Sequence, residues 1–183
     1  MSPLAHIGAV PATVSGARFD PSTLTGKPVV LWFWAPWCTV CRSEAPAVTK
    51  VAADFAGRVD IIGVAGQGTK GAMADFVKQT GTSGLTHLAD VNGTVWRAYG
   101  VSVQPSFAFI TPDGRADLRV GSLDEKTLHA RVAEVATGSA TSTVSLPPGQ
   151  TCSRAPDGTL LCGSAGPGQP TTTIPDPTAS SAR

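Results

Sequence analysis

Apolar runs and amphipathic segments alternate along most of the chain. Continuous apolar runs at residues 29–34 and 59–65 predict strands buried on both faces, as in a parallel sheet. Shorter runs at 86–88, 106–111 and 116–120 predict further strands, and Pro112-Asp113-Gly114 is a typical turn between the last two. A weaker hairpin is expected at residues 11–19, around Ser15-Gly16.

Segments with helical periodicity separate these strands. Residues 39–56, which include Pro46, and residues 93–99 predict two of the helices. In two others, residues 70–79 and the segment that Asp124 would cap, apolar side chains recur on one face: Met73, Phe76 and Val77 in the first, and Leu128, Val132 and Val135 in the second. This order predicts an α/β fold with a central mixed sheet flanked by helices.

The composition changes near Thr137, where Ser, Thr, Pro and Gly begin to dominate. We therefore expect an N-terminal extension at 1–7, one domain at 8–137 and a tail at 138–183. Residues 163–183 are poor in apolar side chains, which predicts a disordered C-terminal tail. Within the tail, Cys152 and Cys162 bracket the turn Pro156-Asp157-Gly158, and we expect them to form a structural disulfide across a small hairpin.

Charge and hydropathy exclude some classes of function. The net charge is +1, charged residues make up 15% of the chain, and no basic stripe is visible, so no nucleic-acid partner is expected. The longest apolar run, residues 29–37, is far too short to span a membrane. The first residues do not resemble a secretory signal, which leaves two possibilities: a cytosolic protein, or a form from which a signal has been removed.

The four cysteines form two pairs, Cys38/Cys41 and Cys152/Cys162. Their spacing does not resemble that of a zinc ribbon, which brings two short Cys-x-x-Cys knuckles together across a short loop. We therefore expect no metal site. Cys38 and Cys41 stand between a buried strand and a helix, and a sulfur at a helix N-terminus is stabilised as the thiolate.

This placement predicts a redox-active pair. Cys38 would be the attacking sulfur, Cys41 the resolving sulfur one helical turn on, and Trp37 would shield the pair from solvent. The alternatives are two buried structural cysteines or half of a metal site. The preceding strand, the tryptophan and the position at the helix start favour thiol–disulfide exchange.

The segment Trp34-Ala35-Pro36-Trp37-Cys38 to Cys41 resembles the signature of the thioredoxin superfamily. The run that continues to Pro46 resembles the TlpA/DsbE-like branch of secreted or membrane-anchored proteins, above all the actinobacterial DsbE-like ones. Three further segments match that branch: residues 26–30, 103–107, and 88–101, which follows its inserted helix. The resemblance implies a thioredoxin fold over about residues 10–137.

The resemblance also implies site residues and partners. Pro105 would be the cis-proline that faces the active site, and the Gln104 backbone beside it would pair with a substrate segment. Pro36, Thr39 and Val40 are further candidates for substrate contact. No cofactor is expected. Exported proteins with thiols or disulfides are the expected substrates, a membrane redox partner would recycle the pair, and the location would be extracytoplasmic.

Many thioredoxins have a buried carboxylate six residues before the first cysteine. This chain has Trp32 at that position. Glu44 is a candidate to replace it in proton transfer, although a role on the helix surface fits equally well. The dipeptide Thr39-Val40 does not give the redox direction. We expect an oxidant, because a stabilised Cys38 thiolate favours the reduced form and Trp32 brings no opposing charge.

Other functions remain open at this stage. The Cys41 to Pro46 run also resembles reductases of cytochrome c maturation. Two soft thiolates would suit a Cu(I) metallochaperone, although Met73 is the only internal methionine. A non-catalytic binding module is the third alternative. Residues 66–71 fit the dinucleotide pattern G-x-G-x-x-G, with Asp90 about twenty residues on. Because they lie in the middle of a domain that another fold already explains, we expect a glycine-rich surface loop and no dinucleotide site. We expect His87 to be a core or edge residue and His129 to be exposed.

Overall fold

A computed structural model describes residues 7–8, 12–138, 150–154, 160–164 and 172–174. It divides the chain into two units, residues 1–144 and 145–183. The larger unit holds a five-stranded sheet in the order β3-β2-β1-β4-β5. Its strands are β1 (Val29–Trp34), β2 (Asp60–Ala65), β3 (Thr86–Ala89), β4 (Ser106–Ile110) and β5 (Ala116–Val120).

The sheet is mixed, as predicted. β1 pairs in parallel with β2, and β2 with β3, whereas β4 runs antiparallel to both β1 and β5. The hairpin between β4 and β5 closes at the expected turn, where Gly114 N donates to Thr111 O at 2.8 Å and Gly114 has a φ of +84°, a value that suits glycine. The shape of the sheet is the α/β thioredoxin fold that the motifs imply.

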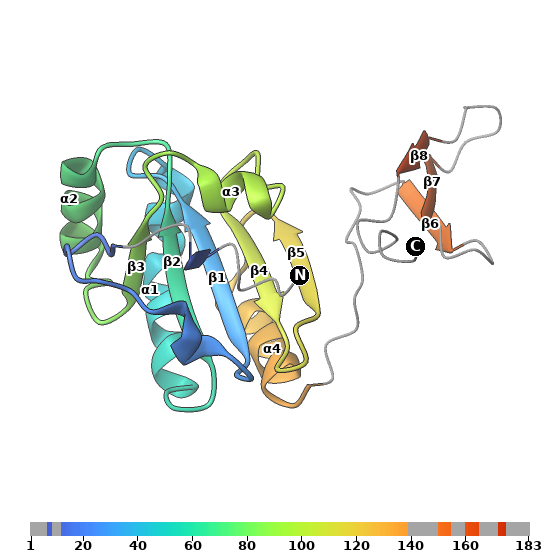
Figure 1. The fold of residues 1–183 in the computed structure, drawn as a ribbon, viewed down its shortest axis with the longest axis horizontal. Coiled ribbons are helices and arrows are strands. Elements are labelled where there is room, and N and C mark those ends of the chain that lie inside the picture. The colour runs from blue at the N-terminus through green and yellow to red at the C-terminus, as the bar shows by residue number, and fades with distance from the viewer. Residues whose placement is uncertain (1–6, 9–11, 139–149, 155–159, 165–171, 175–183) are drawn as a thin grey trace. The chain divides into compact units, whose positions relative to one another are not determined.

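Helices cover both faces of the sheet (Figure 1). They are α1 (Thr39–Asp54), α2 (Lys70–Thr80), α3 (Thr94–Ala98) and α4 (Glu125–Ala136), with a short 3-10 helix, η2 (Pro21–Leu24). α1, α2 and α4 pack with Val30, Trp32 and Trp34 on one face of β1. α3 and η2 pack with Val29, Leu31 and Phe33 on the other. All six side chains of β1 are buried, because the central strand alternates between two cores.

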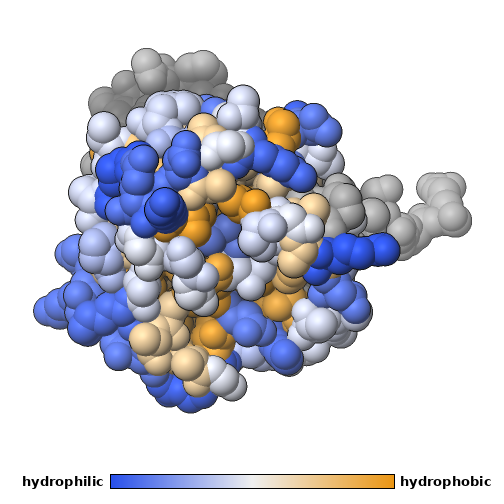
Figure 2. Space-filling view, turned by 90° about the vertical axis from the view of Figure 1, so that its left-hand side faces the viewer, coloured by the Kyte–Doolittle hydropathy of each residue, from blue (hydrophilic) through white to orange (hydrophobic). Residues whose placement is uncertain are grey.

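The predicted helix faces are confirmed. Met73 and Phe76 of α2 are buried, Val77 is half-buried, and Leu128, Val132 and Val135 of α4 are fully buried. Asp124 caps α4 by accepting a hydrogen bond from Thr127 N at 2.7 Å. Along the edge formed by α2, apolar side chains lie in recesses among charged and polar ones (Figure 2). No helix in the described part of the chain is long and apolar enough to cross a membrane.

The smaller unit holds a three-stranded antiparallel sheet of β6 (Gln150–Arg154), β7 (Leu160–Ser164) and β8 (Thr172–Ile174). Cys152 and Cys162 are directly opposite each other in the β6–β7 pair, the arrangement expected of the predicted hairpin. Their disulfide remains a prediction, to be checked by mass mapping of the oxidised protein. β8 lies inside the stretch whose composition predicts disorder, and most of the rest of that stretch lies outside the described residues.

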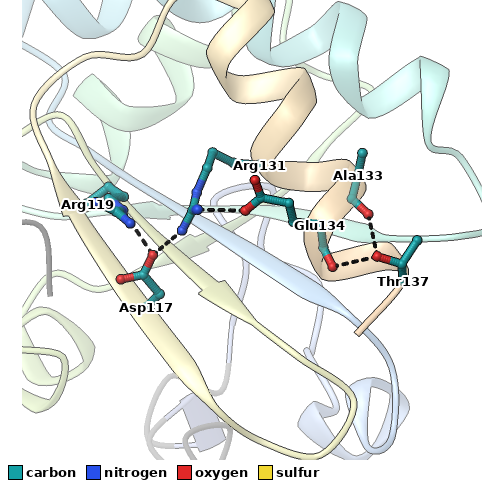
Figure 3. A network of polar contacts seen from close by, with 6 residues as sticks. All are labelled: Asp117, Arg119, Arg131, Ala133, Glu134 and Thr137. Carbon is teal, nitrogen blue, oxygen red and sulfur yellow. Dashed lines mark hydrogen bonds and ion pairs between the residues drawn. The ribbon is translucent and has the colours of Figure 1, made fainter. Parts of the chain in front are cut away.

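A buried ionic network fixes α4 to β5 (Figure 3). Asp117 of β5 is 3% exposed and accepts hydrogen bonds from Arg119 Nε, at 2.9 Å, and from Arg131 Nη2 of α4. Arg131 also donates to Glu134 Oε2 at 2.6 Å, and its guanidinium lies 5.5 Å from the centre of the Phe109 ring. The aspartate therefore offsets two cations where the helix meets the sheet edge.

We expect Asp117→Asn to lower the free energy of unfolding by about 3 kcal/mol, because it leaves two partly buried arginines facing a neutral amide. Denaturant unfolding would measure the loss. Asp60→Asn is the matched control: its pair with Lys27 is exposed at 3.8 Å, and the change should cost less than about 1 kcal/mol. Equal losses in the two variants would contradict a special role for the network.

Candidate active site

The reactive pair lies where β1 gives way to α1. Cys38 is the N-cap residue of α1 and Cys41 lies in its first turn, because the chain turns directly from the buried strand into the helix. The two sulfurs are joined by a disulfide, and the Cα atoms are 5.3 Å apart. The predicted pairing of Cys38 with Cys41 is confirmed.

The helix start stabilises negative charge on Cys38. Its Sγ accepts a hydrogen bond from Cys41 N at 3.0 Å, in the position that a serine or aspartate side chain usually takes at an N-cap. The helix dipole acts in the same direction. The helix start therefore stabilises a thiolate at Cys38 more than a thiolate at Cys41.

Exposure distinguishes the two cysteines as well. Cys38 is 5% exposed, whereas Cys41 is completely buried. A thiolate from another protein therefore reaches Cys38 Sγ first. This asymmetry supports the roles expected for the attacking and resolving sulfurs.

Apolar side chains next to the pair in the sequence, and one in the loop before β4, are exposed. Trp37 is 60% exposed, Val40 is 46% exposed and Val103 is 48% exposed, while Thr39 is exposed and Pro36 half-buried. Large apolar side chains left open to solvent at one site are typical of a surface that contacts a partner. Val103 belongs to the predicted 103–107 loop but was not expected to be a site residue.

The predicted proline loop ends at the same edge of the sheet. The Gln104–Pro105 peptide bond is cis, as expected, and Pro105 is buried. Ser106 is opposite Phe33 in the antiparallel β1–β4 pair, so the residues just before Ser106 and those just after Phe33 share one end of the sheet. Gly121 N donates to Pro105 O at 2.9 Å and ties the loop to the end of β5. Gln104 is half-buried beside it.

Glu44 is buried, and the alternative of a surface role is wrong. The residue is 7% exposed, one helical turn beyond Cys41 on the inward face of α1. Trp32 Nε1 donates a hydrogen bond to Glu44 Oε1 at 2.7 Å, while Oε2 has no partner among the described residues. The chain therefore has a buried carboxylate on α1, at Glu44, and not at position 32 of the strand. Trp32 donates a hydrogen bond to it.

Burial raises the pKa of Glu44 to about 7. The hydrogen bond from Trp32 and the polar backbone of Leu123 oppose this rise, but the loss of hydration outweighs them. A carboxyl group with this pKa is both an available acid and an available base near neutral pH, which suits proton exchange with a cysteine.

Trp34 and His87 form a second buried pair that sequence reasoning did not identify. Trp34 stacks on Phe76 with ring centroids 4.2 Å apart, and its Nε1 donates to His87 Nδ1 at 3.2 Å. His87 Nε2 lies 3.0 Å from Thr82 O, so the ring is neutral with its proton on Nε2. Burial lowers the pKa of His87. The residue is in the core, as predicted, and both ring nitrogens have partners.

The predicted exposure of His129 is confirmed, and Asp90 has a structural role. Asp90 accepts hydrogen bonds from Thr94 N and Trp96 N, at 2.7 and 2.9 Å, and so caps α3 instead of facing a ribose. His129 is exposed, 4.0 Å from Asp54. Within the described residues, no three His, Cys, Asp or Glu side chains are grouped closely enough to hold a metal ion.

Comparison with known proteins places the larger unit in a family of thioredoxin-like proteins. The chain is 40% identical over 124 residues to the soluble secreted antigen MPT53 of Mycobacterium tuberculosis, an overlap of 66% of this chain and 70% of the relative. The structure of MTB DsbF matches with a TM-score of 0.65 and 43% identity over 68% of this chain and 92% of that one. A secreted M. tuberculosis disulfide oxidoreductase homologous to E. coli DsbE matches with a TM-score of 0.62 and 40% identity over 67% of this chain and 92% of that one. Residues 9–117 match the AhpC/TSA family, and the chain belongs to that family.

Proposed function

We propose that this protein is a thiol–disulfide oxidoreductase that acts outside the cytoplasm and mainly oxidises the thiols of exported proteins. The observation that carries the direction is the hydrogen bond from Cys41 N to Cys38 Sγ at the start of α1. Stabilising the thiolate stabilises the reduced form of the pair, which raises its reduction potential. Relatives described as secreted support the location.

The exchange follows from the exposure of the two sulfurs. A substrate thiolate attacks Cys38 Sγ, the Cys38–Cys41 bond breaks, and Cys41 leaves as a thiolate. A second substrate thiolate then attacks the substrate sulfur of the mixed disulfide and releases the Cys38 thiolate. Two electrons pass from the substrate to the pair, and the substrate gains a disulfide. A disulfide of a membrane redox partner takes up these electrons and restores the oxidised pair.

Glu44 supplies the proton that Cys41 needs. Its protonated form gives a proton to the departing Cys41 thiolate, and its ionised form accepts one when the disulfide is made again. The raised pKa populates both forms near neutral pH. Because the carboxyl group is partly neutral, it opposes the Cys38 thiolate less than a fully ionised aspartate would.

A reductase of cytochrome c maturation is the second candidate. The run from Cys41 to Pro46 favours it, and the presence of a buried carboxylate weakens the part of the oxidant argument that rested on Trp32. The reduction potential distinguishes the two directions.

We expect a reduction potential above about −200 mV for the Cys38–Cys41 pair, between those of protein disulfide isomerase and the strong periplasmic oxidant. Equilibration with glutathione buffers would measure it. The oxidised protein should also restore activity to reduced, unfolded ribonuclease, whereas Cys38→Ser should not. A value near −270 mV, that of thioredoxin, would contradict the oxidant assignment and favour the reductase.

Cys41→Ser should accumulate a mixed disulfide through Cys38, because nothing inside the protein then resolves it. Incubation with scrambled ribonuclease, followed by mass spectrometry without reductant, should find one covalent adduct. Cys38→Ser should form almost none, since Cys41 is completely buried. Trapping by Cys38→Ser in place of Cys41→Ser would reverse the two roles.

The stability of the oxidised protein should fall as the pH rises from about 4.5 to 7. In this window the unfolded chain has lost the Glu44 proton, since the ordinary pKa is 4.5, while the folded chain retains it because the pKa is raised to about 7. The folded state binds more protons, so stability declines with pH by on the order of 3 kcal/mol. Denaturant unfolding at pH 4.5 and pH 8 measures the difference.

Three variants assign this decline to Glu44. Glu44→Gln should remove it and slow protein oxidation at pH 7 by about tenfold to a hundredfold. Glu125→Gln should leave the decline in place, because that side chain is exposed beside Lys50. Trp32→Phe removes a hydrogen bond that lowers the pKa of Glu44, so the decline should extend to higher pH. If Glu44→Gln retained the wild-type pH dependence, another group would be responsible.

A further inference from the structure

The loop that joins β2 to α2 is attached to the active-site loop. Trp37 Nε1 donates a hydrogen bond to Gln67 O at 3.0 Å, although the Trp37 side chain is 60% exposed. Gly66 N donates to Trp34 O at 3.0 Å and extends the pairing of β1 and β2 to the edge of the site. The most exposed aromatic side chain beside Cys38 is therefore held by a backbone carbonyl from another loop.

Two positions of this loop have no room for a side chain, which explains why glycine occupies them. A Cβ on Gly66 would lie 2.5 Å from the Trp96 indole, and a Cβ on Gly68 would lie 2.4 Å from Pro36 Cγ. Between them, Gln67 has a φ of +52°, in the left-handed region that few residues other than glycine adopt. The glycine pattern that resembles a dinucleotide fingerprint thus serves close packing of the loop against Pro36 and Trp96.

The same residues shape a groove beside the disulfide. It has a volume of about 350 Å³ and is lined in part by Pro36, Trp37, Gly68, Thr69 and Phe76. Arg42 also lines it: the guanidinium lies 5.0 Å from the centre of the Phe76 ring and donates to Gln79 Oε1 and Pro36 O. Trp37, which lines the groove, directly precedes Cys38 in the chain.

We propose that Gln67 and Gly68 are positioning residues that fix the Trp37 indole as the surface against which an unfolded protein segment lies while its thiol approaches Cys38. A small thiol reaches Cys38 without this surface, whereas a polypeptide must lie across it. The loop therefore sets the preference of the protein for polypeptide thiols over small ones. This inference rests on the proposed thiol–disulfide exchange and adds the residues that select the substrate class.

Gly68→Ala tests the proposal against Gly71→Ala. Gly68 has an ordinary φ, so the added methyl acts through its contact with Pro36, whereas a Cβ on Gly71 meets only Thr69 Oγ1 at 3.9 Å. The experiment follows reduction of each oxidised variant by reduced, unfolded ribonuclease and by dithiothreitol. In Gly68→Ala the ratio of the ribonuclease rate to the dithiothreitol rate should fall about tenfold, because a displaced surface misaligns the polypeptide. Gly71→Ala should keep the wild-type ratio.

The outcomes separate this inference from the proposed function. A wild-type ratio in Gly68→Ala, or an equal loss with both thiols, would overturn the positioning role while leaving the exchange reaction established. If the wild-type protein reacted with neither thiol, the proposed function itself would fail. Trp37→Phe removes the indole donor, and adding Gly68→Ala to it should lower the ratio no further, because both changes act on one contact.

The wild-type protein provides a measurement that does not depend on whether Gly68→Ala folds. In a ¹⁵N-labelled sample, the indole signal lost in Trp37→Phe identifies Trp37. Its N–H should exchange with solvent at least about tenfold more slowly than that of a free indole, because Gln67 O accepts it. Exchange at the free rate would show that the loop does not hold the ring, and the proposal would be wrong.

Discussion

The structure depends on a central strand with both faces buried that ends at the N-terminus of a helix. β1 alternates its side chains between two cores and is paired on both edges, so its end is held firmly. Cys38 lies at that end, where the first helical N–H groups have no carbonyl one turn earlier to bond. The packing of the strand and the reactivity of the sulfur are thus parts of one arrangement: the core fixes the place where the helix field stabilises a thiolate.

The buried carboxylate shows that a chemical requirement can be met from a different element. Trp32 occupies the strand position where many thioredoxins have an acid, and an indole cannot exchange protons as a carboxyl group does. Its N–H nevertheless binds the carboxylate of Glu44, which reaches the same core from α1. The large ring excludes water around the acid, while its single donor limits the cost of burying it. The Trp32 ring therefore helps to desolvate Glu44, and its N–H offsets part of the free energy that this desolvation costs.

Three aromatic side chains beside the site have different environments and different roles. Trp32 and Trp34 are fully buried, and each donates its N–H to a buried titratable group, Glu44 or His87. Trp37 donates to a backbone carbonyl while most of its ring stays exposed. A buried indole needs a partner for its N–H, and an exposed ring needs one to hold its orientation. Trp32 and Trp34 therefore belong to the core beneath the site, and Trp37 belongs to its surface.

The sequence by itself determined the elements and the reactive pair. β1 and β5 have the predicted bounds, the apolar faces of α2 and α4 point inward, and Cys38 and Cys41 follow a buried strand as expected, because periodicity and motif spacing are local properties. Tertiary structure alone decided the rest. That Glu44 is buried under Trp32, that the glycines at 66 and 68 pack against Trp96 and Pro36, and that Asp117 joins β5 to Arg131 of α4 all depend on segments distant in the sequence. A helix position gives the direction of a side chain relative to its neighbours in the sequence, but burial and the resulting pKa depend on which element the fold places opposite it.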